Sequence, residues 1–182
     1  EANVAQRDDI LVWIDLEMTG LDPKTCRIIE LAMILTDREF QMIANPLEIA
    51  IWQPESVLDG MSPFVRAMHT RSGLIDKVRQ SQVDEVGAQT QTMGVLTEIC
   101  RYRTALLAGN SVWQDARFLR NYMPAITDYL HYRIIDISGI KELAGCWYGV
   151  RYEKPPGAKH TAMFDIQQSI AELKFYRDKV MI

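Results

Sequence analysis

Hydrophobic positions along the chain predict five strands. Residues 10–16 and 27–37 are nearly continuous apolar runs, as buried strands are, whereas residues 46–54 alternate apolar with polar positions, as a half-exposed strand does. Two shorter apolar runs, at 105–110 and 132–138, predict two more strands. Three strands therefore come first, and two single strands follow later in the chain.

Elsewhere in the chain, apolar residues recur at the spacing of one helix face, as Val86, Met93 and Leu96 do. One predicted helix ends before Pro124, which cannot continue it. The predicted helices cover 63–69, 84–101, 112–123, 139–145 or just beyond, and 161–177. Helices that alternate with strands predict an α/β fold, with a mixed sheet and helices packed on it.

Composition limits the classes of partner. The chain has 182 residues, a formal charge of −4 and a pI of about 5.4, which argues against a broad basic surface that coats long nucleic acid. A short polyanionic substrate held by a local pocket and metal ions remains compatible with that charge. Three scattered cysteines indicate a reducing compartment, and neither a disulfide framework nor a zinc site.

No apolar run approaches the roughly 18 residues that a membrane-spanning helix needs, so we expect no membrane partner. The first residues, EANVAQRDD, contain no apolar segment typical of a secretory signal. We expect a cytoplasmic protein if the chain is bacterial, or a mitochondrial one if it is eukaryotic and a transit peptide has been removed.

Two acids interrupt the first strand, which reads LVWIDLEMTG. Asp15 and Glu17 lie at i and i+2, so they share a face about 6.6 Å apart. Two ionised acids side by side repel each other, and their burial is costly without a compensating cation. The alternative is a strand that ends in solvent, with both acids facing water.

A third acid, Asp115, follows the strand at 105–110. Ser111 and Gln114 fit the S-x-x-Q capping box, which predicts a helix beginning at Val112. Asp115 then falls in the first turn, close to the end of the preceding strand. The alternative is an acid that only complements the helix dipole.

A histidine and a fourth acid stand near the last predicted helix. The Pro-Pro-Gly sequence in residues 153–159 predicts a loop, and Thr161 is a candidate N-cap. His160 then lies on the loop and Asp165 one turn into the helix, so both can point toward one site. The alternative is a surface histidine beside another acid that complements a dipole.

The order Asp-x-Glu, Asp and His-x4-Asp resembles the DEDDh family of 3′-to-5′ exonucleases. Within that family, LVWIDLEMTGLDP, RIIELA, GNSVWQDARFL, YMP, HYRIIDIS, IKELA and SIAELKFYR are similar to segments of the oligoribonuclease group. The similarity extends from about Leu11 to Arg177. It implies an RNase H-like exonuclease fold, a mixed five-stranded sheet flanked by helices. We expect a single exonuclease domain at 10–182, after a flexible segment at 1–9.

The resemblance also implies the chemistry. Two divalent cations, Mg²⁺ or Mn²⁺, would lie about 4 Å apart and clamp the attacking and leaving oxygens of a phosphodiester. His160 would accept the proton of the attacking water. The implied metal ligands are Asp15, Glu17, Asp115 and Asp165.

The resemblance assigns eight residues to the substrate: Leu21, Phe64, His69, Ser111, Tyr132, Arg133, Ser138 and Lys141. Leu21 corresponds to an apolar wedge between two bases, and Phe64 to an aromatic that stacks on a base. The last four reach the partner's site in a homodimer, where they would cap a 5′ phosphate. The alternative is that Leu21 and Phe64 are core residues and Lys141 belongs to a solvated helix face.

The chain departs from the family pattern beside the expected site. Trp113 stands where the family usually has a small residue. Basic residues of the family pattern are replaced in this chain by Ala116, Gly145 and Cys146. Phe164 stands where a second acid often precedes the last catalytic aspartate. These changes concern the fit of the substrate and the charge around the site.

The sequence therefore predicts an enzyme that hydrolyses very short RNA, down to dinucleotides, from its 3′ end to 5′ mononucleotides. One alternative is a DEDDh exonuclease that acts on longer RNA or single-stranded DNA. A second is a catalytically weak homologue that serves as a subunit of a larger assembly.

Overall fold

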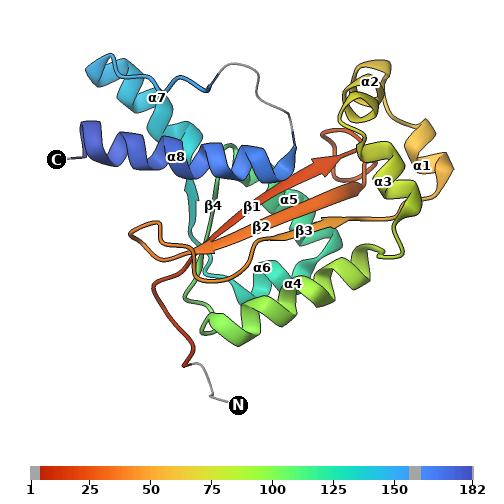
Figure 1. Cartoon of the computed structure of the whole chain (residues 1–182), viewed down its shortest axis with the longest axis horizontal. Helices are drawn as coiled ribbons and strands as arrows, with labels where there is room; N and C mark the ends of the chain where they lie inside the picture. The colour runs from red at the N-terminus through yellow and green to blue at the C-terminus, as the bar shows by residue number, and fades with distance from the viewer. Residues whose placement is uncertain (1–4, 156–160, 182) are drawn as a thin grey trace.

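The computed structural model describes residues 5–155 and 161–181, which form a mixed five-stranded sheet with helices on both faces (Figure 1). The strand order across the sheet is β3-β2-β1-β4-β5. The strands are β1 (Leu11–Met18), β2 (Ile28–Thr36), β3 (Leu47–Ala50), β4 (Leu106–Gly109) and β5 (Ile134–Asp136). The prediction of a mixed five-stranded sheet flanked by helices is confirmed.

Strand directions bring several chain segments to one edge of the sheet. β1 pairs antiparallel with β2, and β2 with β3, whereas β1, β4 and β5 run parallel. The carboxyl ends of β1 and β4 therefore meet where β2 begins. A register shift in the β1–β2 pair follows Glu17, at this same edge. Such irregularities are frequent beside active sites, because they re-aim neighbouring side chains.

The helices complete three layers. They are α1 (Glu55–Asp59), α2 (Pro63–Arg71), α3 (Leu74–Gln80), α4 (Glu85–Ile99), α5 (Val112–Tyr122), α6 (Pro124–Tyr129), α7 (Ile137–Tyr148) and α8 (Ala162–Val180). Alternate side chains of β1 explain the layering. Val12, Ile14 and Leu16 pack with α4, α5 and α6, whereas Leu11 and Trp13 pack with α7 and α8.

A third apolar cluster holds α1, α2 and α3 against the start of β2. It includes Ile29 of β2 with Leu58, Ile75 and Val78, and all four are buried. The cluster places α2 beside the carboxyl end of β1, where the buried His69 side chain reaches the Met18 carbonyl with its Nε2 at 2.9 Å.

Some boundaries differ from the prediction. The last strand ends at Asp136 because its carboxylate accepts a hydrogen bond from the Ser138 N–H and caps α7. α6 begins at Pro124, because a proline that cannot continue one helix suits the first position of the next. α1 and α3 were not predicted, since both are short and their pattern is indistinct.

The described part of the N-terminal segment pairs with the rest of the chain. The Arg7 N–H donates to the Ile99 carbonyl at 2.8 Å, and the Arg7 carbonyl accepts from the Arg101 N–H at 2.9 Å. A domain boundary at residue 10 stays a prediction. Within 5–155 and 161–181, no helix is both long and apolar enough to cross a membrane.

Candidate active site

Three acids converge at the carboxyl end of β1. Asp15 and Glu17 point to the face of the sheet that α8 covers, and Asp165 joins them from the first turn of α8. One oxygen of each carboxylate lies within 4.8 Å of the others. The solvent-facing alternative for Asp15 and Glu17 is therefore wrong, since both are only partly accessible and face a third acid.

The start of α8 fixes Asp165. The Thr161 hydroxyl accepts a hydrogen bond from the Phe164 N–H at 3.3 Å, and the Thr161 carbonyl accepts from the Asp165 N–H at 3.0 Å. The predicted N-cap at Thr161 is thus confirmed. His160, the predicted general base, lies outside the described residues.

Asp115 approaches the same site from α5. It occupies the fourth helical position, as predicted, and its side chain is buried. Its Oδ1 accepts from the Leu16 N–H at 2.9 Å, so the carboxylate lies against the backbone between Asp15 and Glu17.

The predicted capping box at the start of α5 is wrong. Ser111 has a φ of 51°, in the left-handed region, and its side chain makes no capping hydrogen bond. Asp136 of β5 replaces it, because an ionised carboxylate is a stronger acceptor than a hydroxyl. Its two oxygens accept from the N–H groups of Ser111 at 3.0 Å and Trp113 at 3.3 Å. Gln114 instead donates its side-chain amide to the Leu21 carbonyl.

Burial and mutual repulsion make the acid cluster a strong candidate for cations. Burial, followed by the charge of Asp115, raises the pKa of Asp15 to about 9. Burial, followed by the charge of Glu30, raises the pKa of Glu17 to about 8. Burial raises the pKa of Asp115 to about 7, although the hydrogen bond from Leu16 opposes the shift. A nearby cation offsets both the cost of burying the negative charges and their mutual repulsion.

The donor set fits hard divalent cations. Carboxylate oxygens are the ligands that Mg²⁺ and Mn²⁺ prefer, and no soft sulfur donor belongs to the described cluster of acids. The Lys154 Nζ already lies 3.1 Å from the Asp165 Oδ1, so the cluster attracts positive charge from its own chain.

The predicted substrate residues differ in exposure, and among those described next His69 contacts one of the acids. Leu21 and Phe64 are 74% and 78% exposed, so the alternative that they are core residues is wrong. His69 is buried with its Nδ1 3.9 Å from the Glu17 Oε2, and burial lowers the pKa of its ring. Tyr132 is 77% exposed, and the Arg133 guanidinium lies 5.3 Å from the centre of its ring.

The two remaining predicted residues are held by acids. Ser138 donates its N–H to the Asp136 Oδ1 at 3.1 Å, so Asp136 joins the first residues of α7 to Ser111. The Lys141 Nζ lies 3.8 Å from the Oε1 of the buried Glu172. The functional roles of all the named site residues stay predictions.

The departures from the family pattern have local explanations. Ala116 belongs to the buried core of α5, where a cation would be costly. A side chain added at Gly145 would begin 3.2 Å from the Arg151 guanidinium, so a cation remains beside that position. Cys146 is exposed, and Trp113 is 52% exposed with Arg117 over its ring.

Sequence reasoning missed Asp136, Glu30 and Lys154. The first two interrupt apolar runs that were predicted as strands, and a buried acid within a strand is the signal that finds them. Lys154 lies in a predicted loop and carries no such signal.

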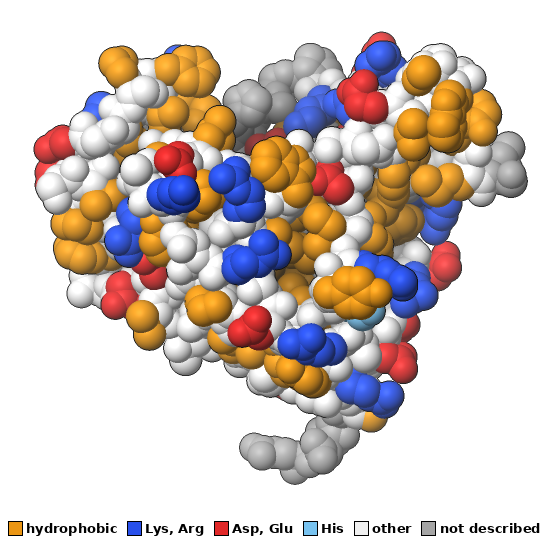
Figure 2. Space-filling view, turned by 180° about the vertical axis from the view of Figure 1, so that it is seen from behind, with side chains coloured by type: hydrophobic (Ala, Val, Ile, Leu, Met, Phe, Trp, Pro, Cys, Tyr) orange, Lys and Arg blue, Asp and Glu red, His pale blue; other side chains and the backbone are white. Residues whose placement is uncertain are grey.

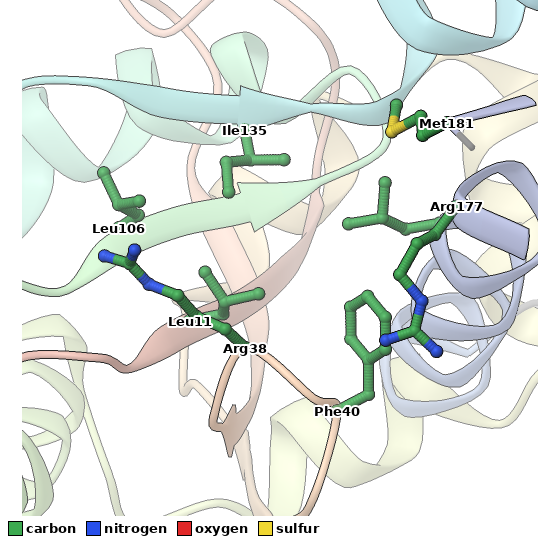
Figure 3. Close-up of a pocket in the computed structure, with 8 residues that line it drawn as sticks. Leu11, Arg38, Phe40, Leu106, Ile135, Arg177 and Met181 are labelled. Atoms are coloured by element: carbon green, nitrogen blue, oxygen red, sulfur yellow. The ribbon is translucent and has the colours of Figure 1, made fainter.

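An apolar pocket at the opposite end of the sheet is separate from the acids (Figure 3). Its volume is about 270 Å³, and Leu11 at the start of β1 contributes to its lining with Leu106 and Ile135. Arg177 stacks over Phe40 at its rim, 4.9 Å from the ring centre. At about 3.3 Å per strand residue, Leu11 lies more than 13 Å along the strand from Asp15.

Comparisons with known proteins find exonucleases and oligoribonucleases. A family model described as exonuclease, RNase_T, matches residues 12–173. An oligoribonuclease of Francisella tularensis subsp. tularensis is 45% identical over 177 residues, which cover 97% of this chain and 98% of that protein. An oligoribonuclease of Shewanella loihica is 48% identical over 174 residues, which cover 93% and 94% of the two chains.

Solved structures match the same architecture. The zinc-bound form of an E. coli exonuclease I complex with single-stranded DNA has a TM-score of 0.75 at 17% identity, over 96% of this chain and 42% of that one. Exonuclease I of Methylocaldum szegediense has a TM-score of 0.73 at 18% identity, over 94% of this chain and 41% of that one. The chain thus spans about two fifths of the exonuclease I chains, and the likeness establishes the RNase H-like exonuclease fold.

Proposed function

The chain belongs to the oligoribonuclease family of exonucleases, and from this premise we propose how it holds and cleaves its substrate. It is a 3′-to-5′ exoribonuclease, a nuclease that hydrolyses phosphodiester bonds. The observation that carries the proposal is the convergence of Asp15, Glu17 and Asp165 within 4.8 Å at the end of β1.

In this proposal, Asp15, Glu17, Asp115 and Asp165 hold two divalent cations, Mg²⁺ or Mn²⁺. Such ions, when bound, supply Lewis acidity to the attacking and leaving oxygens of the phosphodiester. The proximity of Asp15 to all three other acids, each of which raises its pKa, supports its role as the ligand shared between two ions.

The chain's own groups move the proton and position the RNA. His160 accepts a proton from the water that attacks the terminal phosphorus, and the bond from phosphorus to the 3′ oxygen breaks. The products are a 5′ mononucleotide and an RNA shortened by one residue. Leu21 and Phe64, whose side chains are both exposed, are placed against the bases.

We propose that the substrates are very short, down to dinucleotides. Arg133, Ser138 and Lys141 would cap the 5′ phosphate, with Ser111 and His69 as further polar contacts. The cap of α7 supports this, because Asp136 accepts from the Ser138 N–H and so fixes the start of the helix that carries both Ser138 and Lys141.

Cleavage should therefore be fastest on a 5′-phosphorylated dinucleotide and fall with length. In the decisive assay, purified protein is incubated with Mn²⁺ or Mg²⁺, and its cleavage rate is measured on RNAs of two, five and twenty nucleotides. Loss of the 5′ phosphate should weaken dinucleotide binding roughly ten- to hundredfold, because charge-assisted hydrogen bonds contribute about 1.5–3 kcal/mol each.

Lys141→Ala should weaken binding of the phosphorylated form only, with Lys174→Ala as the control. Equal rates on two and twenty nucleotides would reject the cap and favour an exonuclease for longer RNA.

We propose that the active form is a homodimer. Around β5 and α7 the chain exposes a set of large apolar side chains: Tyr132, Ile134, Leu143, Trp147 and Tyr148. Figure 2 shows apolar side chains gathered over α7 at its upper right, while Lys and Arg are scattered over the face. Exposed aromatic clusters of this kind mark interaction surfaces, and a two-fold pair would cover the same patch on both chains.

If Tyr132 and Arg133 complete the partner's site, two inactive variants should complement each other. Asp115→Ala lacks a metal ligand, and the double variant Tyr132→Ala, Arg133→Ala lacks the partner contact. After subunit exchange, about half of the dimers are mixed and each has one intact site, so about a quarter of the native activity should return. No recovery after verified exchange, or full activity of a demonstrated monomer, would mean that each chain builds its own site.

A further inference from the structure

Glu30 is an acid in a costly position that the proposed mechanism does not use. It lies in the middle of the apolar run of β2, and only 3% of its surface is exposed. In the β1–β2 pair it stands directly opposite Glu17. Like charges directly opposite each other destabilise an antiparallel pair, and an apolar residue would avoid that cost.

The Glu30 side chain contacts the start of α8. Its Oε2 accepts a hydrogen bond from the Ala162 N–H at 3.4 Å, in a buried environment. Ala162 is the first residue of α8 and is fully buried, so water cannot replace this acceptor. Together, Glu30 and the Thr161 hydroxyl, which accepts from the Phe164 N–H, provide acceptors for two donors of the first turn.

This contact joins two parts of the acid cluster. Asp165 lies one turn after Ala162, whereas Glu17 lies across the β1–β2 ladder from Glu30. The carboxylate of Glu30 therefore connects the strand pair that carries two of the acids to the helix that carries the third.

We propose that Glu30 is a positioning residue, which fixes the start of α8 so that Asp165 meets Asp15 and Glu17 at the spacing that a cation requires. The inference rests on the proposed function, because it assumes that these acids hold metal. Residues that orient metal ligands commonly contribute ten- to a hundredfold to metal affinity or activity.

Two conservative variants separate the reach of Glu30 from its charge. Glu30→Asp keeps the charge but shortens the side chain, so it loses contact with the Ala162 N–H. Glu30→Gln keeps the length and an accepting oxygen but loses the charge. Glu98 provides matched controls, since it is an exposed acid on α4. Glu98→Asp and Glu98→Gln should behave like the native chain.

We expect Glu30→Asp to lower Mn²⁺ affinity in calorimetry about ten- to a hundredfold and to lower kcat, with KM for the dinucleotide unchanged. Glu30→Gln should retain the native affinity and kcat. It should also raise the thermal midpoint of the metal-free protein, because the repulsion with Glu17 is relieved. If Glu30 only filled space, the two variants would not differ in this way, with Mn²⁺ affinity lost in Glu30→Asp and thermal stability gained in Glu30→Gln.

Amide hydrogen exchange in the metal-free protein tests the contact itself. Exchange at Ala162 should be faster in Glu30→Asp than in the native chain and in Glu30→Gln. Native Mn²⁺ affinity and exchange in Glu30→Asp would overturn the proposal, and so would an equal loss of affinity in both variants. Failure of the native chain to bind Mn²⁺ would instead overturn the metal site, and the exchange comparison would still decide the role of Glu30.

Discussion

Asp15→Asn should lower turnover by at least about four orders of magnitude, which equals roughly 5.5 kcal/mol of transition-state stabilisation. Asp165→Asn should have a similar effect. Each substitution keeps the size of the side chain and removes a charged oxygen from a cluster whose ligand atoms lie within 4.8 Å. Initial rates on a 5′-phosphorylated dinucleotide at saturating Mn²⁺ measure the loss. Asp178→Asn is the matched control, because Asp178 lies on the same helix with its side chain 52% exposed.

Asp15→Asn should change stability in the opposite direction. Burial and the neighbouring acids raise the pKa of Asp15 to about 9, so in the metal-free protein this side chain costs stability at neutral pH. Asparagine removes that cost, and the thermal midpoint with a chelator should rise by about 2–4 °C for each kcal/mol recovered. Added Mn²⁺ should stabilise the native chain but not the variant. A variant that retained turnover, or the same response to Mn²⁺, would contradict the assignment of Asp15 as a ligand.

The turnover of the native chain and of Asp15→Asn also decides whether the protein is a catalytically weak subunit of a larger assembly. Such a protein gains nothing from a buried cluster of acids, because the cluster only destabilises it. Turnover by the native chain that Asp15→Asn abolishes would exclude that alternative. A native chain without turnover on any of the three RNA lengths would favour it.

The parts of the fold that depend on local sequence could be predicted. The apolar runs of β1 and β2 are buried on both faces, and that burial leaves an unmistakable pattern. The start of α8 was also predictable, because a threonine N-cap acts within three residues of itself. In the same way, the fourth helical position of Asp115 follows from the start of α5 at Val112.

The parts that depend on distant contacts could not be predicted. Ser111 and Gln114 satisfy the capping pattern, yet Asp136 caps α5 from a strand 25 residues away. Nothing local to Ser111 reports that the strand order places β5 beside β4. Glu30 is the same kind of case, because its partner Ala162 is 132 residues away. Sequence pattern thus identifies the acids of the site, and only the fold identifies the groups that hold them.

The exposed apolar residues also could not be assigned from the sequence. Leu21 and Phe64 could be read as core residues, since apolar character alone does not distinguish a buried side chain from a binding surface. Their exposed fractions of 74% and 78% decide the question, and both lie on segments that border the acids. The side-chain amide of Gln114 donates to the Leu21 carbonyl, so the backbone of the turn is held in place although the Leu21 side chain is exposed.

His160→Ala should lower kcat by a factor of about 10² to 10⁴, the usual contribution of a general base. In the proposed mechanism the variant loses the group that accepts the proton of the attacking water, whereas the four carboxylates assigned to the cations remain. Mn²⁺ affinity in calorimetry and KM for the dinucleotide should therefore stay close to the native values. Added imidazole should restore part of the rate, because it can accept the same proton.

The comparison with Asp165→Asn makes this prediction specific. His160 and Asp165 are five residues apart in the sequence, so general damage to this part of the chain would affect both variants alike. A ligand and a base differ instead in one measurement: Asp165→Asn should lose Mn²⁺ binding, and His160→Ala should keep it. Loss of Mn²⁺ binding in His160→Ala would make this histidine a ligand. In that case imidazole should restore metal binding together with the rate, and another group on the chain must accept the proton.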